Sequence, residues 1–598
     1  MDSIGESLST VAEEWLTQFE IALATDDKDL LSTLFLPQSH WRDLLAITWD
    51  ITTSSGAGVI ASRLVSFQAE MGATEFRLDE TDAPVRVVSR GGKEAVIEAI
   101  YSFATVHGRG HGVFRLLQDP ADGGKLKAWT LLTALNSIAG HEETVGADRP
   151  TGEAYSRDFK GPNWQDRRNA AIAYENHDPE VLVVGGGQAG LSAAARLTQL
   201  DVDTLIVDSN ARVGDNWRKR YHALVLHNQV HVNHFPYLPF PPNWPTYIPK
   251  DKLAGWFEAY VELMELNYWT NTTFTGGVYD EVRGQWRAEL SDSHGTTKTV
   301  RPKHIVMATS VSGIPNVPVI PTLEIFKGNV IHSGKYVGSR DLAGANVLII
   351  GTGTSGHDIA QDLHSNGANP TLVQRSPTLV LNVEPAAQLP YTLYNEAISL
   401  NTKDLIASSM PLEPLKAAHK WMAEEASRLD AALIDKLENA GFRIDHEDVY
   451  GWQFKYMNRG GGYYFNVGCS DLVANGEVGL IQSDNIETFV ADGVRMKDET
   501  FLPVDIVILS TGYKGPEEMV RNLMGEDVAG RVGRIWGWNE DKQELNNMWM
   551  RTGQPGLWFT AGSFAQCRIY SKYLGMQIKA CLEGLIRTDK PNIKLQCY

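Results

Sequence analysis

Short apolar runs bounded by turn residues recur through the second part of the chain. Runs of this length that are rich in Val, Ile and Leu are typical of strands buried on both faces of a parallel sheet. The clearest are VLVV at 181–184, DTLIVDS at 203–209, KHIVMATS at 303–310, NVLII at 346–350 and DIVILSTGY at 505–513. The first run is followed by LSAAARLTQL, a helical pattern. Strands that alternate with helices predict an α/β fold.

The first 150 residues follow a different pattern. Val11, Trp15, Phe19 and Leu23 recur at helical spacing. After them come runs that are typical of strands, namely VRVVS, EAVIEAIYSFAT, HGVFRLLQD and LKAWTLLTAL. Helices followed by a curved antiparallel sheet predict an α+β cone for residues 1–150.

The order of these elements and the stretch HWRDLLAITWD resemble the nuclear-transport-factor-two-like, or polyketide-cyclase-like, cone. Domains of this kind hold a small ligand, catalyse a reaction or pack against a partner, so the resemblance leaves the role of this domain open. His40, Trp41, Arg42 and Asp43 are candidates for lining a pocket. A contact between domains is the favoured interpretation, because Trp and Arg are enriched at interfaces.

Three later segments differ from the strand–helix pattern. Residues 151–178 are polar and show no sustained period, so we expect a linker. Residues 253–270 predict an amphipathic helix, and residues 385–465 predict a helical insertion that ends in YGWQFKYMNRGGGYYFNVG, a glycine-rich loop that packs as a turn or contacts substrate. The core-facing stripe of the insertion is predicted to consist of Trp421, Leu429, Leu433 and Leu437.

Composition narrows the class of function. The 598 residues carry a formal charge of −19, which argues against a nucleic-acid-binding surface. The chain shows neither the basic and apolar regions of a signal peptide nor the ~18 uninterrupted apolar residues of a membrane span, so we expect a cytoplasmic protein. Because Cys469, Cys567, Cys581 and Cys597 form no C-x-x-C pair, we expect buried, reduced thiols and no metal site.

The strand at 181–184 runs into Gly185-x-Gly187-x-x-Gly190. A strand that turns sharply into a helix places backbone N–H groups and the positive end of the helix where a pyrophosphate binds. Such a motif alone is weak, because glycine turns are common in α/β proteins. The next strand ends in Asp208, where a carboxylate accepts hydrogen bonds from a ribose 2′-hydroxyl, and this spacing strengthens the prediction of a dinucleotide site.

A second strand–turn–helix contains Gly351-x-Gly353-x-x-Gly356, and its following strand ends in Arg375 and Ser376. A guanidinium pairs with a 2′-phosphate, whereas a carboxylate repels one. The two strand ends therefore predict FAD at the first motif and NADPH at the second.

Three other stretches are predicted to approach the cofactors. The segment that begins GDNWRKRYHALVLHNQ is dense in aromatic residues and suits a loop over a flat ring system, with Trp217 and Arg218 nearest the cofactor. The strand DIVILSTGY ends in small residues, among them Thr511 and Gly512, which permit close approach of backbone to cofactor. The helix after PGLWFTAGSF aims its N-terminus at the pyrimidine edge of the flavin.

Together these motifs resemble the flavin-containing monooxygenase family, and most of all its soluble YUCCA-like and fungal branch. The most specific element is Phe326-x-Gly328-x-x-x-His332-x-x-x-Tyr336, between the two glycine motifs. The Gly214-x-x-Trp217 segment and Ser510-Thr511-Gly512-Tyr513 also match. The resemblance covers residues 179–598 and leaves residues 1–150 outside.

The resemblance implies that NADPH reduces FAD, that O2 forms a C4a-(hydro)peroxyflavin, and that one oxygen atom is inserted into a small organic metabolite, lipophilic or acidic. His332 would be a structural or coupling residue near an interdomain hinge, or a core histidine with satisfied hydrogen bonds. The Asn that heteroatom-oxidising relatives place near the flavin falls at His227, with Asn228 next to it. We therefore treat His227, Asn228 and His332 as the catalytic candidates.

Two departures from the family pattern keep alternatives open. Tyr336 and Val337 stand where the Baeyer–Villiger branch has Trp followed by Pro or Asp, which favours the monooxygenase branch and leaves oxidation of a ketone as the alternative. Ala561, Gly562 and Ser563 replace an acidic residue that many relatives carry after the last strand, so a side chain there is not expected to hold the flavin. A third hypothesis for the function is that the chain is an NADPH-oxidising flavoprotein whose N-terminal domain binds a ligand or partner.

The fold class predicted is α/β, with two dinucleotide-binding domains after an α+β cone. We expect the cone at 1–150, a linker at 151–178, the first part of the FAD-binding domain at 179–342, the NADPH-binding domain with its insertion at 343–500, and the second part of the FAD-binding domain at 501–598. A homo-oligomer is left open. The expected cofactor-binding residues are Gly185, Gly187, Ala189, Gly190, Asp208, Trp217, Arg218, Gly351, Gly353, Thr354, Ser355, Gly356, Arg375, Ser376, Thr511 and Gly512.

Overall fold

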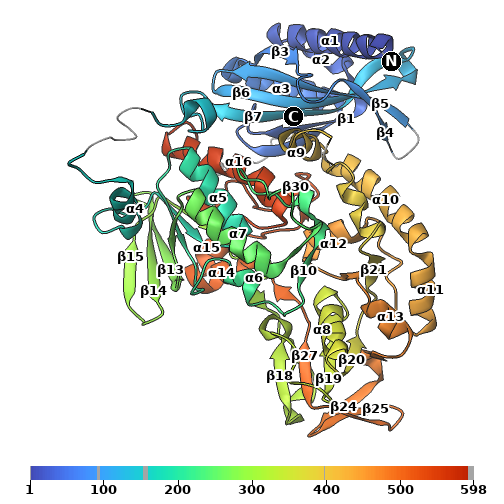
Figure 1. Cartoon of the computed structure of the whole chain (residues 1–598). Helices are drawn as coiled ribbons and strands as arrows, with labels where there is room; N and C mark the ends of the chain where they lie inside the picture. The colour runs from blue at the N-terminus through green and yellow to red at the C-terminus, as the bar shows by residue number, and fades with distance from the viewer. Residues whose placement is uncertain (1, 91–93, 152–158, 396, 590–598) are drawn as a thin grey trace.

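The computed structural model describes residues 2–90, 94–151, 159–395 and 397–589. Figure 1 shows an N-terminal domain above a body that contains two parallel sheets, with a group of helices along one side. This arrangement confirms the α/β class and the two dinucleotide-type folds. Cys597 and part of the predicted linker lie outside the described residues.

The N-terminal domain packs helices against a seven-stranded sheet. Trp15 and Phe19 of the first helix are buried, and the Trp15 ring contacts the Phe114 ring with centroids 4.7 Å apart. The four predicted strand runs are confirmed, and the likeness to a cone fold stays a prediction. The expected order of helices followed by an antiparallel sheet is wrong in part: the strands at 35–44 and 51–55 precede the helix at 57–71, and the 35–44 strand pairs in parallel with the strand at 125–138. The elements are α1 (Asp2–Ala24), α2 (Lys28–Thr33), α3 (Ala57–Met71), β1 (Phe35–Leu44), β2 (Ile51–Ser55), β3 (Thr74–Leu78), β4 (Arg86–Arg90), β5 (Glu94–Thr105), β6 (Gly108–Asp119) and β7 (Lys125–Ile138).

The first parallel sheet has the strand order β12-β9-β8-β16-β31. Its central strands are buried along their whole length, as the unbroken apolar runs require. Its strands are β8 (Val181–Val184), β9 (Thr204–Val207), β12 (Asn267–Trp269), β16 (His304–Met307) and β31 (Leu557–Phe559). Around it lie α5 (Gln188–Gln199), α6 (Asp215–Arg218), β10 (Val225–Gln229), β11 (Tyr247–Pro249), α7 (Lys250–Leu263), α14 (Pro516–Met524), α15 (Glu526–Val532), α16 (Phe564–Leu582) and the sheet β13 (Thr272–Asp280), β14 (Gln285–Asp292) and β15 (Thr297–Val300).

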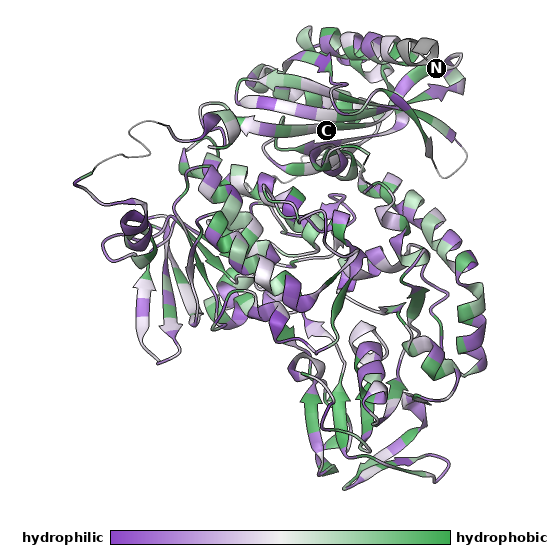
Figure 2. Ribbon diagram, in the orientation of Figure 1, coloured by the Kyte–Doolittle hydropathy of each residue, from purple (hydrophilic) through white to green (hydrophobic). Residues whose placement is uncertain are grey.

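The second parallel sheet has the order β18-β27-β19-β20-β23, and Figure 2 shows its strands as hydrophobic. Two of its strands differ from the expected domain boundaries, because β18 and β27 lie in ranges assigned to the FAD-binding parts. β18 pairs with β27, and β27 pairs with β19, so both strands belong to the second sheet. The elements are β18 (Asn329–His332), β19 (Asn346–Ile350), α8 (Thr354–Ser365), β20 (Asn369–Gln374), α13 (Cys469–Ala474), β23 (Gly479–Gln482), β24 (Ile486–Val490), β25 (Gly493–Met496), β26 (Phe501–Pro503) and β27 (Ile506–Leu509).

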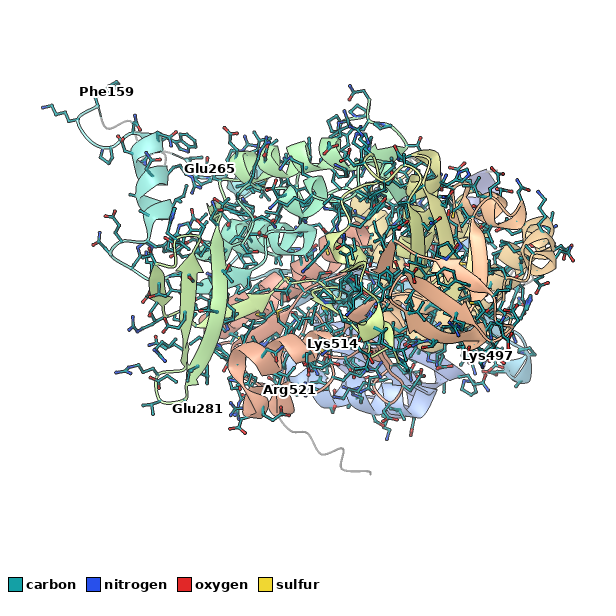
Figure 3. All side chains as sticks on the ribbon, turned by 90° about the horizontal axis from the view of Figure 1, so that it is seen from below. Phe159, Glu265, Glu281, Lys497, Lys514 and Arg521 are labelled. Carbon is teal, nitrogen blue, oxygen red and sulfur yellow. The ribbon has the colours of Figure 1, made fainter. Side chains whose placement is uncertain are left out.

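Two short strands carry the chain between the two sheets. β17 (Ile314–Pro315) leads into the second sheet, β28 (Tyr513–Lys514) leads back, and the two pair with each other. In Figure 3, Lys514 lies near the middle of the molecule, between Glu281 at one end and Lys497 at the other. The paired crossings therefore form the hinge region between the two dinucleotide folds.

The helical insertion is confirmed, but several local predictions within and around it are wrong. The expected glycine-rich loop contains α12 (Gly451–Arg459) and β22 (Tyr463–Asn466), which pairs with β21 (Leu379–Asn382). The predicted 253–270 helix ends at Leu263, and the predicted linker contains α4 (Trp164–Ala173). The remaining elements are α9 (Leu400–Ser408), α10 (Leu412–Leu429), α11 (Ala431–Asn439), β29 (Trp538–Asn539) and β30 (Glu544–Leu545).

The predicted core stripe of the insertion is only half correct. Leu433 and Leu437 are buried, whereas the Trp421 and Leu429 side chains are 43% and 38% exposed. The reason is a break between α10 and α11 at Asp430, which rotates the apolar face so that one stripe does not continue through both helices.

A buried ion pair joins the N-terminal domain to the body. Arg42 on β1 donates from Nε and from a terminal nitrogen to the two carboxylate oxygens of Glu544, at 2.8 and 2.7 Å. It also donates to the Ser408 carbonyl at 2.6 Å, while the Thr53 hydroxyl donates to Glu544 at 2.8 Å. Arg551 adds a second link, 3.1 Å from Asp50. Arg42 is therefore the domain contact that the sequence favoured.

Two further features of the structure concern its helices and its cysteines. Within the described ranges, no helix has the length and hydrophobicity needed to cross a bilayer. Cys469, Cys567 and Cys581 are free and buried, as expected.

The Arg42–Glu544 pair predicts a specific pattern of stability. Arg42→Ala leaves a carboxylate buried without its guanidinium, and we expect it to destabilise the docked domain by about 3–5 kcal/mol. The double variant Arg42→Met/Glu544→Met removes both charges and should cost far less, since a desolvated pair contributes little net stability. Thermal unfolding midpoints and protease release of the N-terminal domain measure both. A double variant as unstable as the sum of the single variants would contradict the expectation.

Candidate functional site

The first glycine turn is shaped by close backbone packing. Gly185 has φ +107°, and a Cβ there would lie 2.7 Å from the carbonyl oxygen of Ala308. A Cβ on Gly190 would collide with the Gly185 carbonyl oxygen. Gly187, by contrast, is the N-cap of α5, and a Cβ on it would meet only Asn216 Nδ2, at 3.2 Å. Two glycines thus pack the strand against the helix, while the third leaves space before the helix N-terminus.

The second glycine turn repeats this geometry. Gly351 has φ +117°, and its Cβ would collide with the Ser510 carbonyl oxygen. A Cβ on Gly356 would collide with the Gly351 carbonyl oxygen, whereas a Cβ on Gly353 would have its nearest neighbour, the Tyr463 carbonyl oxygen, at 3.8 Å. Both turns therefore present open backbone at a helix N-terminus, where an anionic pyrophosphate is stabilised.

The strand ends next to the two turns differ in charge and in setting. Asp208 accepts hydrogen bonds from the backbone N–H groups of Gly186 and Asn210, both at 2.8 Å. Its carboxylate is thereby fixed beside the first turn. Arg375 and Ser376, beside the second turn, are exposed. A fixed carboxylate suits a free ribose hydroxyl, and an accessible guanidinium suits a phosphate.

The N-terminus of α16 lies at the first turn. Gln188 Nε2 donates to the Gly562 carbonyl at 3.3 Å, and Ser563 and Gln566 form a capping box. Trp217 lies near it, with its ring stacked against Phe564 at 6.1 Å. Its buried Nε1 has no hydrogen-bond partner among the described residues. Since buried donors are normally paired, this N–H is available to hydrogen-bond a ligand.

Arg218 and Ala189 have other environments. Arg218 donates to Asp215 at 2.5 Å and to Glu258 at 3.1 Å, so its guanidinium is occupied by acidic side chains on α6 and α7. Ala189 is buried in the first turn of α5, where its small side chain allows close packing. Neither side chain presents an open hydrogen-bonding group to the turn.

His227 and Asn228 lie where the insertion meets the first fold. The His227 ring packs edge-on against Phe465 at 5.8 Å, and its carbonyl accepts from Gln388 at 3.0 Å. Asn228 Nδ2 donates to the Tyr391 hydroxyl at 3.2 Å.

Thr354 and Ser355 extend this contact to the second turn. The Thr354 hydroxyl donates to the Tyr463 carbonyl at 3.0 Å, and the Tyr463 and Phe465 rings lie 5.1 Å apart. Ser355 is exposed at the start of α8. Strand β22 therefore connects the second glycine turn to the His227 loop, and residues of both folds meet there.

His332 is held at both ring nitrogens. Nδ1 accepts from the Gly334 N–H at 3.1 Å, and Nε2 lies 3.0 Å from the Gly512 carbonyl, to which it donates. Burial lowers the pKa of His332, so the ring is neutral near neutral pH. This geometry agrees with the structural reading of His332.

Thr511 and Gly512 follow Ser510, which packs against Gly351 of the second glycine turn, and they lie in the segment that connects the two folds. The Thr511 hydroxyl donates to the Asn316 carbonyl at 2.5 Å, and Gly512 accepts from the Asn316 N–H at 3.0 Å. Their backbone hydrogen bonds hold the two crossing segments together.

A cavity of about 350 Å3 lies next to the α16 N-terminus. Ser563 and Gln566 line one side of it, and so does Tyr391, the partner of Asn228. The N-terminal domain, the insertion and the segment 538–550 supply the other walls. Arg42, which the sequence indicated as a candidate for lining a pocket, lies in the wall. The other lining residues come from segments that only tertiary packing brings together.

Comparison with known proteins identifies the family. The flavin-binding monooxygenase-like model matches residues 178–516. The probable indole-3-pyruvate monooxygenase YUCCA10 of Arabidopsis thaliana is 32% identical over 341 residues, 56% of this chain and 81% of the relative. The indole-3-pyruvate monooxygenase YUCCA1 of Oryza sativa subsp. japonica is 26% identical over 351 residues, 58% of this chain and 80% of the relative. The structure of cyclohexanone monooxygenase with epsilon-caprolactone has a TM-score of 0.50 at 17% identity over 69% of this chain and 89% of that one, a likeness of fold.

The matched range contains both glycine turns, both strand ends and both crossing strands, and residues 1–177 lie outside it. The chain therefore belongs to the flavin-binding monooxygenase-like family and is an FAD- and NADPH-dependent monooxygenase.

Proposed function

We propose that the turn at Gly185–Gly190 holds FAD, that the turn at Gly351–Gly356 holds NADPH, and that the enzyme inserts one oxygen atom of O2 into a small organic molecule. The main support is that two glycine turns of the same geometry lie next to side chains of opposite charge, Asp208 at the first turn and Arg375 at the second. Asp208 is fixed by two N–H groups, whereas Arg375 is exposed. The open space at Gly187 and Gly353 fits the pyrophosphate of each dinucleotide.

When bound, the flavin supplies the redox chemistry that activates O2. The protein's own residues bind, orient and exclude water. Backbone N–H groups at the starts of α5 and α8 stabilise the pyrophosphates, and the Trp217 indole N–H offers a hydrogen bond beside the first turn. The α16 N-terminus places positive potential at the same location.

We further propose that His227 and Asn228 face the reaction site from the junction of the two folds. The contacts of His227 with Phe465 and of Asn228 with Tyr391 support this placement. Each residue contacts one aromatic side chain, and such contacts limit the access of water from that side. Arg218, Thr511 and Gly512 act by holding α6 and the hinge.

Two oxygenation chemistries follow from the family, oxidation of a nitrogen or sulfur atom and Baeyer–Villiger oxidation of a ketone. Product analysis with a thioether and a ketone of the same size, under steady turnover, distinguishes them. A cytoplasmic location also belongs to the proposal, supported by three free buried thiols. A homo-oligomer is tested by light scattering.

Arg375 carries the assignment of NADPH to the second turn. Arg375→Ala should raise the KM for NADPH at least tenfold, about 1.4 kcal/mol, and leave the KM for NADH nearly unchanged, because only NADPH carries the 2′-phosphate. Steady-state oxidation of both coenzymes measures it. Arg495→Ala, at another exposed arginine of the same fold, is the matched control. Equal losses with both coenzymes would remove the assignment.

The two open glycines distinguish the two sites. Gly187→Val should give a folded protein without flavin, because a β-branched side chain fills the space of the pyrophosphate while its Cβ meets only one protein atom within 4 Å. Gly353→Val, its geometric counterpart, should keep its flavin and reduce it with NADPH at least tenfold more slowly. The flavin absorbance per protein and stopped-flow reduction measure both. A fully flavin-loaded Gly187→Val variant would contradict the proposal.

We expect replacement of His332 to lower the stability of the protein without changing the pH dependence of flavin reduction. His332→Ala leaves the Gly512 carbonyl and the Gly334 N–H without their partner, at a cost of about 1–3 kcal/mol. Because the folded pKa is lowered, wild-type stability falls as the pH drops below about 6.5, and the difference from the variant shrinks there. The pH profile of flavin reduction between about pH 6 and pH 9 should keep its shape. Loss of one limb of that profile would instead indicate a proton-transfer role.

A further inference from the structure

The cavity beside α16 is built by four parts of the chain. One of them is the segment 538–550, which contributes Glu544, Met548 and Met550. The N-terminal domain contributes Ile51 and Arg42, helices α9 and α10 of the insertion form another wall, and α16 contributes Ser563 and Gln566. In Figure 1 the N-terminal domain lies over α9 and α16, on the side where these parts meet. The matched family range covers the insertion but neither the N-terminal domain nor α16.

One end of the cavity touches the proposed flavin site. Ser563 and Gln566 belong to the capping box of α16, and the preceding Gly562 accepts the hydrogen bond from Gln188 in the first glycine turn. Tyr391 lines the cavity and accepts a hydrogen bond from Asn228. A molecule in the cavity would thus lie next to both the first turn and the His227–Asn228 loop.

The charges at the cavity wall are already paired. Arg42 is bidentate to Glu544, and Arg115 lies 2.7 Å from Glu98, with all four side chains at most 7% exposed. His419 is also in the wall, and burial lowers its pKa to about 4, so it is neutral at neutral pH. Among the described residues that line the cavity, no charged side chain lacks an opposite charge. A carboxylate or ammonium group would be desolvated there without compensation.

Most of the remaining side chains in the wall are apolar, and the polar ones are uncharged, among them Thr392, Gln453 and Gln566. Its side chains include Met410, Met422, Met457, Met548 and Met550, together with several aromatic rings. Methionine side chains adjust to ligands of irregular shape and contact aromatic groups favourably. A volume of about 350 Å3 is within the range of small-molecule sites.

We propose that this cavity is the substrate site, that the N-terminal domain is its outer wall, and that the enzyme takes uncharged, largely apolar molecules. The inference rests on the assignment of FAD to the first turn, since only that assignment places the cavity beside the flavin. It selects the lipophilic class over the acidic class, and it gives the N-terminal domain a role in substrate binding. Arg42 and Glu544 are positioning residues, because their pairing holds the wall in place.

Two probes of nearly equal size test the substrate class. Equilibrium dialysis is carried out with the oxidised, flavin-loaded full-length enzyme and two probes, methyl p-tolyl sulfide and 4-(methylthio)benzoate. The second probe carries a carboxylate in place of the ring methyl group of the first. We expect the sulfide to bind at least tenfold more tightly. Equal or tighter binding of the benzoate, or no measurable binding of the sulfide, would overturn the proposal.

Three variants test the walls. Ile51→Trp narrows the cavity from the N-terminal domain, and Ala418→Trp narrows it from α10. Each should weaken binding of the sulfide at least tenfold and leave the rate of flavin reduction by NADPH within about twofold. Lys420→Trp adds the same ring to the exposed side of α10 and should leave binding unchanged.

The experiments distinguish failure of the substrate-site proposal from failure of the assignment of FAD to the first glycine turn. If Ala418→Trp weakens binding and a folded Ile51→Trp does not, the N-terminal domain is not a wall and the proposal fails. Where Ile51→Trp does not fold, Ile51→Ala replaces it and should shift the preference toward a longer aryl alkyl sulfide; an unchanged preference also overturns the proposal. Loss of flavin in Gly187→Val is measured without substrate, so it tests the FAD assignment separately.

Discussion

The close approach of a helix to the strand before it determines where both cofactor sites lie. At each glycine turn, the third glycine lies against the carbonyl of the first, so that any side chain would separate strand and helix. This contact leaves the helix N-terminus at the edge of the sheet with its N–H groups directed outward. The middle glycine leaves the space in front of it open. One packing constraint, present twice, thus defines two binding sites.

The connection between the two folds gives these sites their relative position. The chain crosses to the second sheet and returns on β17 and β28, which pair, and His332 and Thr511 fasten the crossing segments. The motif Phe326-x-Gly328-x-x-x-His332-x-x-x-Tyr336 contributes to the same attachment, since Phe326 and Tyr336 are buried in the two cores of the second fold. The residues of this motif therefore help to join the two folds.

The sequence predicts features that depend on local chemistry and fails where tertiary packing decides. The sequence alone predicts two kinds of feature, the strands around Val181 and Asn346 and the charges at the strand ends, Asp208 and Arg375. Each of these properties belongs to a few adjacent residues. The exposure of Trp421, the α12 helix and the occupied guanidinium of Arg218 were not predictable in this way. They depend on the bend at Asp430, on the packing of Trp452 and on Glu258, which lies far along the chain. Of the residues that line the cavity at the α16 N-terminus, the sequence indicated Arg42 as a pocket candidate; the cavity as a whole depends on tertiary packing.

The partner of Arg42 has a consequence for biosynthesis. Glu544 follows Arg42 by 502 residues, and Ser408 follows it by 366. During translation the N-terminal domain therefore emerges and has time to fold long before the ribosome has made the surface on which it docks. Arg42 can pair with Glu544 only after residue 544 has left the ribosome. Closure of the molecule is thus a late event of synthesis, and a chain that is truncated before residue 544 lacks the carboxylate that holds its first domain in place.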